Sequence, residues 1–204
     1  MRLWSGFVAP YPIQKIAYGI DYYWKDNYMS TDEEMRYDRW MRMGQWRKIV
    51  DYSRSHIPQQ ASSRNVVQMA MWNLHLISLQ SLQSHLDPTK DVMQSTSGAF
   101  IMSDIYMQMG LINMAQRAAF EAMESIPNHN KSGRALRRLT ETAVATGQAE
   151  VAQKYLAILG ETITLRKWAK GMRPLAINAE SAIQSPFYKK LRGIYSKSED
   201  FFFY

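Results

Sequence analysis

The 204-residue chain contains no cysteine, which excludes disulfide frameworks, thiolate metal sites and cysteine nucleophiles but leaves the cellular compartment open. Glycine and proline are scarce, with 10 and 7 residues, so few positions interrupt regular secondary structure. A membrane-spanning helix requires roughly 18 to 20 consecutive apolar residues. Even the apolar segment 100–123 carries Asp104, Arg117 and Glu121. We therefore expect no membrane-spanning segment in this chain.

The residues that are present favour a folded, helical protein. The chain is 46% hydrophobic and 21% charged, with a mean hydropathy of -0.38, which is typical of a packed domain rather than a disordered one. Methionine, glutamine, alanine and leucine are frequent, and these side chains lose little rotamer freedom in a helix. The composition therefore predicts an all-α fold.

Similar short phrases recur around single glycines and mark the ends of helix-like segments. They centre on Gly44, Gly110 and Gly147, which are 66 and 37 residues apart. The larger interval is twice 33 residues, close to the period of about 34 residues of helix–turn–helix repeats of the tetratricopeptide kind. A further turn is then predicted near Ile77 and Ser78. This region has no glycine, so we expect a degenerate unit there or two helices that run together.

The apolar residues on either side of Gly110 follow the spacing of a helix face. Each set recurs at i, i+3, i+4 and i+7, which indicates two amphipathic helices that meet at the glycine. Helix starts are expected at Thr31, which can form a capping box with Glu34, and at Ser132. The first set is Ala99, Met102, Ser103, Tyr106 and Met109, and the second is Ile112, Ala115, Ala119, Ala122, Met123 and Ile126.

With Gly110 at its turn, the segment 96–127 resembles a tetratricopeptide repeat. Small Ser103 lies at the close-packing position of the first helix, with Tyr106 three residues later, and Pro127 lies at the terminating position. The second helix has small residues where its neighbours would approach, and looser units surround Gly44 and Gly147. The resemblance covers roughly residues 30–164. It implies antiparallel helical hairpins stacked as a short tetratricopeptide-like α-solenoid. The small residues of the second helix are Ala115, Ala119 and Ala122.

Two other segments, 110–127 and 137–142, resemble the soluble tail of an uncharacterised bacterial family of polytopic membrane proteins. This resemblance carries no known activity. It implies that the chain is the soluble part of a membrane protein, so both a cytoplasmic and a membrane-associated location stay open.

The ends of the chain differ from its middle. Residues 1–29 are rich in aromatic side chains and are expected to form an N-terminal cap over the helical hairpins of residues 30–164. Residues 165–204 are expected to hold C-terminal helices and a frayed tail. One helix is predicted through Trp168 with its end near Gly171, and another from Leu175 to Pro186.

No catalytic motif is recognisable. Phosphate-binding loops, dinucleotide-binding glycine patterns and nucleophile elbows are all missing from the sequence. The four histidines are dispersed. A two-histidine site from His75 and His85 competes with separate, unrelated histidines. The carboxylates 32–34 are read as the first turn of a helix, where the helix dipole favours negative charge, rather than as an acid–base pair. We predict no catalytic residue, metal site or cofactor. An enzyme on a helical scaffold would need a deep pocket with convergent carboxylates or histidines.

The function expected from this reading is a protein–protein interaction or scaffold module. A stack of helical hairpins has a concave side that recognises a peptide or another domain. First-helix residues would line this groove in the repeat register. The candidate binding residues are Asn73, Met102, Tyr106, Arg137, Thr140 and Glu141.

The formal charge of +7 supports an alternative in which the C-terminal half binds nucleic acid or another acidic surface. Because acidic residues are interleaved with the basic ones, a solvated helix face explains the same charges. The tryptophans at positions 40, 46, 72 and 168 are read as packing residues rather than as a platform for stacking bases. The basic residues concerned are Arg134, Arg137, Arg138, Arg166, Lys167, Lys170 and Arg173.

Overall fold

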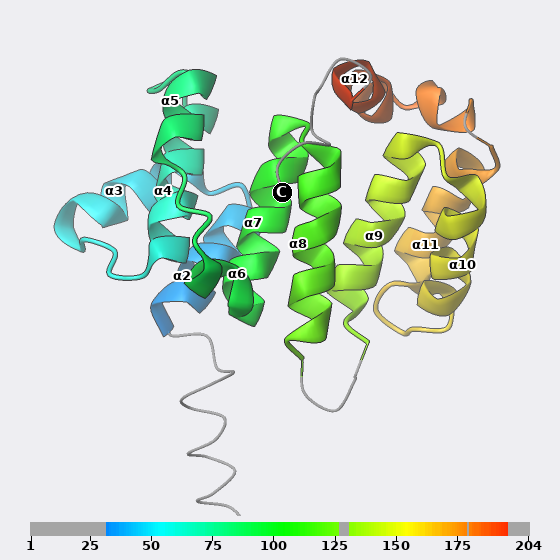
Figure 1. The fold of residues 1–204 in the computed structure, drawn as a ribbon, viewed down its shortest axis with the longest axis horizontal. Coiled ribbons are helices and arrows are strands. Elements are labelled where there is room, and N and C mark those ends of the chain that lie inside the picture. Colours follow the sequence, from blue (N-terminus) through cyan, green and yellow to red (C-terminus); the bar gives the residue numbers. More distant parts are fainter. Residues whose placement is uncertain (1–31, 127–130, 179, 196–204) are drawn as a thin grey trace, which may run out of the picture.

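The computed structural model describes residues 32–126, 131–178 and 180–195, and in these residues every regular element is a helix (Figure 1). The all-α prediction is confirmed. The expected cap of residues 1–29, the capping box at Thr31, the closing Pro127 and the tail from Ser196 lie outside the described residues. The α-helices are α2 (Asp32–Arg42), α3 (Trp46–Ser55), α4 (Ala61–Asn73), α5 (Leu79–His85), α6 (Lys90–Gln94), α7 (Thr96–Met109), α8 (Ile112–Glu124), α9 (Gly133–Thr146), α10 (Ala149–Gly160), α11 (Arg166–Met172) and α12 (Pro186–Tyr195), with 3-10 turns at Arg173–Ala176 and Ser181–Gln184.

The helices pack as adjacent antiparallel pairs. Helices α7, α8, α9 and α10 lie side by side in chain order, each in contact with the next (Figure 1). Helices α2 and α4 pack on α7 from the N-terminal side, whereas α11 and α12 complete the C-terminal end against α10 and α9. The main hydrophobic core extends from Tyr37 to Leu191, and a second small cluster of Ala99, Phe100, Ala122 and Ala135 lies between α7, α8 and α9. Ten of the fourteen residues of α7 are buried, so α7 is the central helix of the main core.

The glycine-marked corners lie where the sequence predicts them. Gly44, Gly110 and Gly147 adopt φ values of +65°, +84° and +80°. After each glycine, the next backbone N–H donates to a carbonyl five residues earlier, as from Leu111 to Tyr106 at 2.9 Å. This is the Schellman motif, which ends a helix through a left-handed residue and favours glycine because it has no Cβ.

A fourth corner closes in the same way without a glycine. His75 has a φ of +57°, and the Leu76 N–H donates to the Met71 carbonyl at 2.9 Å. The four corners at residues 44, 75, 110 and 147 are therefore spaced by 31, 35 and 37 residues. The sequence predicted this turn near Ile77, two residues from its observed position. The alternative prediction, that the two helices run together, is wrong. Histidine is among the side chains that enter the left-handed region more readily than most.

The small residues of α8 allow close packing against its neighbours, as expected. Ala115, Ala119 and Ala122 are fully buried. Ser103 of α7 donates a hydrogen bond from Oγ to the Ala115 carbonyl at 2.8 Å, so this small polar residue also ties the two helices together. Trp40 is buried, and the tryptophans at 46, 72 and 168 pack against the same core.

The C-terminal part differs from the sequence prediction. A helix through Trp168 ends at Met172, as expected, but no helix runs from Leu175 to Pro186 in the described residues. Two 3-10 turns occupy this stretch because Asn178 Oδ1 accepts hydrogen bonds from the Glu180 and Ser181 backbones at 3.0 and 2.8 Å, which competes with helix formation. Pro186 begins α12 instead of ending a helix, since a first-turn proline has no N–H to lose.

None of the described helices combines the length and apolar character required to cross a bilayer.

We predict that His75→Gly raises the free energy of unfolding by about 0.5–1 kcal/mol. Glycine removes a left-handed strain of roughly 1–2 kcal/mol but costs about 0.5–1 kcal/mol in unfolded-chain entropy. The His75 side chain is exposed, so little packing is lost. Urea denaturation of the two proteins measures the difference. His75→Ala is the control, because it shortens the side chain but keeps the strained backbone. A glycine variant less stable than the alanine variant by the full entropic cost of about 0.5–1 kcal/mol would show that no strain is stored at this corner.

Candidate functional site

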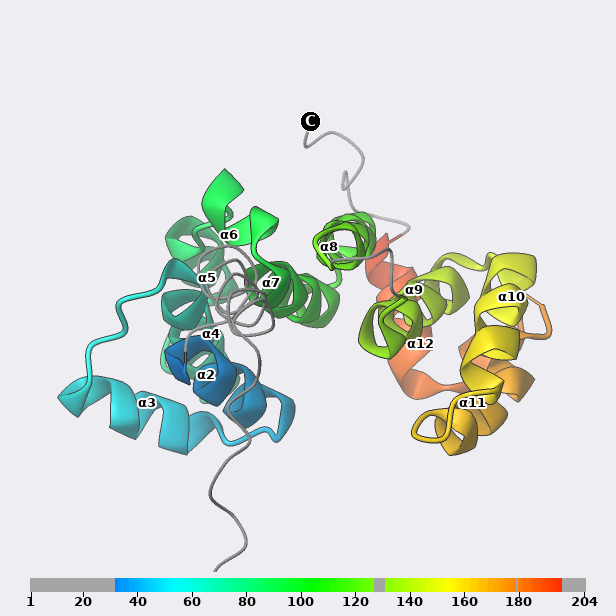
Figure 2. The same cartoon turned by 90° about the horizontal axis from the view of Figure 1, so that it is seen from below.

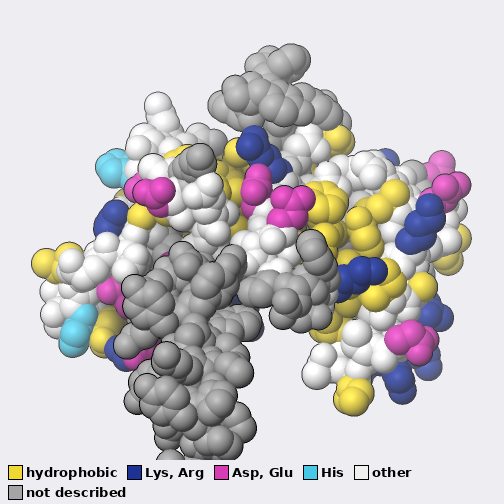
Figure 3. Space-filling model, turned by 60° about the horizontal axis from the view of Figure 1, so that its bottom comes forward, with side chains coloured by type: hydrophobic (Ala, Val, Ile, Leu, Met, Phe, Trp, Pro, Cys, Tyr) yellow, Lys and Arg dark blue, Asp and Glu magenta, His cyan; other side chains and the backbone are white. Residues whose placement is uncertain are grey.

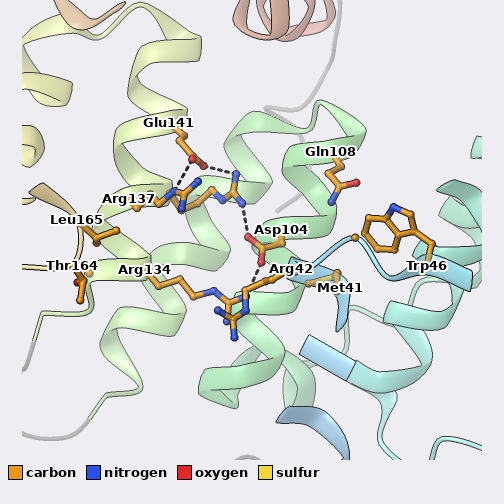
Figure 4. Close-up of a pocket in the computed structure, with 13 residues that line it drawn as sticks. Met41, Arg42, Trp46, Asp104, Gln108, Arg134, Arg137, Glu141, Thr164 and Leu165 are labelled. Carbon is orange, nitrogen blue, oxygen red and sulfur yellow. Dashed lines mark hydrogen bonds and ion pairs between the residues drawn. The ribbon is translucent and has the colours of Figure 1, made fainter. Parts of the chain in front are cut away.

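A pocket of about 790 Å³ lies between the N-terminal and C-terminal helices (Figure 4). Viewed from below, α2 and α7 stand on one side and α9 and α11 on the other (Figure 2). Its walls come from the α2–α3 corner, α7, α9 and the segment before α11. The lining residues are Met41, Arg42, Gly44, Trp46, Asp104, Gln108, Gly133, Arg134, Arg137, Arg138, Glu141, Thr164 and Leu165.

Helix α9 supplies the largest group of charged side chains. Arg134, Arg137, Arg138 and Glu141 are spaced at i, i+3, i+4 and i+7, so they share one face of the helix. The opposite positions, including Leu139, are buried in the core. Helix packing therefore turns the charged face toward the pocket.

Arg134 joins three helices. Its Nη1 and Nη2 atoms donate to the two carboxylate oxygens of Asp38 in α2, at 3.1 and 2.7 Å. Nη2 also donates to Asp104 in α7 at 2.6 Å. The guanidinium lies 4.6 Å from the centre of the Phe100 ring, where the aromatic face attracts a cation. A bidentate pair of this kind fixes both distance and orientation.

Arg138 continues the network on the same helix. It donates a hydrogen bond to the second Asp104 oxygen and forms an ion pair with Glu141 at 2.8 Å. Its Nε atom is buried without a hydrogen-bond partner among the described groups. A buried donor without a partner is costly, which makes this atom a candidate for a ligand or water contact.

The electrostatics of Asp104 follow from these neighbours. Burial alone would raise the pKa of Asp104, but Arg138 and Arg134 outweigh it and hold the pKa below its usual value. Burial likewise opposes the charge of each arginine, yet the carboxylates that face them raise the pKa of both Arg134 and Arg138. All three groups therefore remain charged at neutral pH.

Arg42 and Arg137 are different, since about half of each side chain is exposed (54% and 48%). Each donates a hydrogen bond to a described carboxylate through Nε: Arg42 to Asp38 at 3.0 Å and Arg137 to Glu141 at 3.1 Å. Arg137 also lies 5.0 Å from the Trp168 ring centre. Both terminal amino groups of Arg42 and Arg137 are left without a hydrogen bond to a described residue. They are oriented donors available to a ligand.

The rest of the wall is apolar or neutral. Met41, Trp46 and Leu165 supply apolar surface, and Gln108 and Thr164 supply uncharged polar groups. Within the described residues, no group of three or more metal-binding side chains comes together. The arrangement suits reversible binding of a ligand that has both negative and apolar groups.

The structure separates the six predicted binding residues. Arg137 and Glu141 line the pocket. Asn73 is half-buried and donates to the Met69 carbonyl at 2.9 Å and to pocket-lining Gln108 at 3.5 Å. The other three, Met102, Tyr106 and Thr140, are buried in the core, so their expected exposure on a groove is corrected. The physical reason for Met102 and Tyr106 is that α7 is covered by α2 and α4 as well as α8. The Thr140 hydroxyl instead donates to the Leu136 carbonyl at 2.8 Å.

Sequence reasoning missed Asp38, Arg42 and Asp104 as members of the site. The sequence could have indicated Asp104, because it is the one carboxylate of a largely apolar helix and a buried carboxylate requires a charged or hydrogen-bonding partner. No such indication exists for Asp38, since its partner Arg134 is 96 residues away in the chain.

Three of the seven basic residues considered for a strip in the C-terminal half already have carboxylate partners. Arg134, Arg137 and Arg138 are paired with carboxylates, as described above. On the face shown in Figure 3, acidic side chains of the described residues are interspersed among the basic ones. The acidic residues 32–34 lie in the first turn of α2, as expected, where Glu33 accepts backbone hydrogen bonds from Gln59 and Gln60.

A family model described as a family of unknown function (DUF6057) matches residues 3–204. The chain belongs to the DUF6057 family. No curated protein and no solved structure matches this DUF6057 chain. The tetratricopeptide-like register therefore stays a prediction.

We predict that Asp104→Asn lowers the free energy of unfolding by about 3 kcal/mol, since it removes the shared partner of two poorly solvated arginines. Chemical denaturation measures the loss. Glu121→Gln is the control, because Glu121 pairs with Arg117 on the exposed face of α8 and such pairs contribute about 0–1 kcal/mol. Similar losses for the two variants would contradict a structural role for the network.

The same carboxylate predicts acid sensitivity. Because the pKa of Asp104 is lower in the folded protein than in the unfolded chain, the unfolded chain takes up protons first as pH falls. The stabilisation is therefore complete above the unfolded value of about 3.9 and is lost as pH falls through the folded pKa. Unfolding free energies measured from pH 7 to pH 3 should fall less steeply in Asp104→Asn than in the wild type. Parallel curves would exclude this carboxylate as the cause.

Proposed function

We propose that this chain is a protein–protein interaction module that binds a peptide or a domain of a partner in the pocket between α2, α7 and α9. The observation that carries the proposal is the pair of half-exposed guanidinium groups, Arg42 and Arg137, each held in place by a carboxylate at the edge of an already open pocket. Preorganised donors beside apolar surface reduce the ordering cost of binding.

We further propose that the helix pairs constitute a short tetratricopeptide-like solenoid with this pocket on its concave side. Four corners support this reading, because all of them use the same backbone motif at intervals of 31, 35 and 37 residues. In a solenoid each unit contacts chiefly its neighbours, and the concave side is the usual binding surface.

Binding of nucleic acid through the basic C-terminal half is the less favoured proposal. Phosphate binding requires cations that are free to replace counterions, and the α9 arginines are largely committed to carboxylates. Because the chain resembles the soluble tail of a membrane-protein family, the proposed partner includes a protein attached to a membrane.

A variant that fills the pocket provides the test. Thr164 lines the pocket from the exposed segment before α11, so Thr164→Trp should occupy it without disturbing the core. In affinity capture from native lysate with quantitative mass spectrometry, we expect at least one partner to fall about tenfold or more with Thr164→Trp, which corresponds to about 1.4 kcal/mol.

Ile163→Trp is the matched control, because Ile163 is 94% exposed and does not line the pocket. It should retain the same partners at wild-type levels. If folded Thr164→Trp protein captures every partner as well as Ile163→Trp does, the pocket is not the binding site.

A further inference from the structure

We propose that the ligand of this pocket is an acidic segment of a protein, whose side-chain carboxylates bind between Arg42 and Arg137. This inference rests on the proposed function and specifies the chemistry of the partner. It depends on three independent properties of the pocket: the free donor geometry of two arginines, the charge balance of the walls, and the apolar surface beside them.

The donor geometry fits carboxylates. In Arg42 and Arg137 the Nε–H is already used, on Asp38 and Glu141 respectively, and this contact restricts the rotation of each guanidinium. The two terminal amino groups of each residue remain in a planar arrangement that can donate two parallel hydrogen bonds to one carboxylate. Arg42 projects from the end of α2 and Arg137 from α9, so the two donors come from different walls (Figure 4).

The charge balance of the lining is positive. Four arginines line the pocket against two carboxylates, Asp104 and Glu141. Asp38 lies outside the lining but pairs with Arg42 and Arg134, so the excess is one positive charge. Both lining carboxylates already accept from Arg138, and each has a further arginine partner, so neither is available to a basic ligand. Gly133, in the first turn of α9, also lines the pocket, where the positive end of the helix dipole adds to the attraction for an anion.

The apolar wall favours a peptide over a bare anion. Trp46 and Met41 lie on the α2–α3 side and Leu165 lies near α9, next to the charged groups (Figure 4). An acidic residue flanked by an apolar one would satisfy both kinds of surface. The site is a bounded pocket and not a long basic stripe, which fits a short protein segment better than a nucleic-acid backbone.

The test uses a random-peptide display library as the probe and the full chain as the bait. Selection on the wild type should enrich peptides with Asp or Glu next to an apolar residue. The affinity of the enriched peptides, measured by fluorescence anisotropy, should fall about tenfold or more in Arg42→Gln and in Arg137→Gln, as expected for loss of a charged hydrogen-bonded pair. Arg137→Lys should give an intermediate loss, since it keeps the charge but not the planar donor pair.

Arg117→Gln is the matched control, because this arginine is similarly exposed on α8 and does not line the pocket. It should bind as the wild type does. Both test variants should fold, since Asp38 still pairs with Arg134 when Arg42 is replaced, and Glu141 still pairs with Arg138 when Arg137 is replaced. Thermal unfolding of each variant verifies this before binding is measured.

The outcomes separate this inference from the proposed function. If the enriched peptides lose affinity for the Thr164→Trp protein but show no preference for acidic residues, the pocket binds peptides and the inference fails. If no enriched peptide depends on the pocket, the inference fails, while the proposed function is decided separately by the capture experiment with Thr164→Trp. Competition with inorganic phosphate and with glutarate distinguishes the anion: stronger displacement by phosphate, or by a short single-stranded oligonucleotide, would overturn the assignment to carboxylates.

Discussion

The ion pairs of Arg134 hold the two halves of this molecule in a fixed relation. They link α2, α7 and α9 across a distance of 96 residues in the chain, at a place where burial makes an unpaired charge costly. Hydrophobic packing brings the helices together but is non-directional. Bidentate contacts require one distance and one orientation, so the network determines where the walls of the pocket stand.

The sequence was most informative about local structure. Helical periodicity and the left-handed preference of glycine placed the corners at Gly44, Gly110 and Gly147, because both are properties of a few neighbouring residues. The corner at His75 was located only approximately. Its backbone forms the same motif, but histidine adopts a positive φ much less often than glycine does, so it marks a corner less clearly. The helix predicted from Leu175 does not form because the Asn178 side chain accepts hydrogen bonds from nearby backbone N–H groups. Asparagine disfavours helix interiors for this reason, and the prediction did not weigh it.

The site was less predictable because it depends on contacts between distant segments. Arg137 and Glu141 were identified from the repeat register, whereas Asp38 and Arg42 required knowledge of which helix lies opposite α9. Met102 and Tyr106 were misplaced for a related reason. In a regular stack, the first helix of each hairpin keeps one open face, but α7 is covered on several sides and buries both side chains.

Two kinds of arginine therefore share the same carboxylates. Arg134 and Arg138 are largely buried and complete the fold. Arg42 and Arg137 use only Nε in hydrogen bonds to the described residues and leave their terminal amino groups for a ligand, although Arg137 also packs over Trp168. Asp38 pairs with the buried Arg134 and the half-exposed Arg42, and Glu141 pairs with the buried Arg138 and the half-exposed Arg137. A carboxylate that orients a half-exposed arginine thus also stabilises the helix contact behind it. If the proposed acidic ligand binds the outer arginines, stability and recognition are coupled at these two residues, because a bound anion stabilises the folded state and offsets the excess positive charge of the pocket.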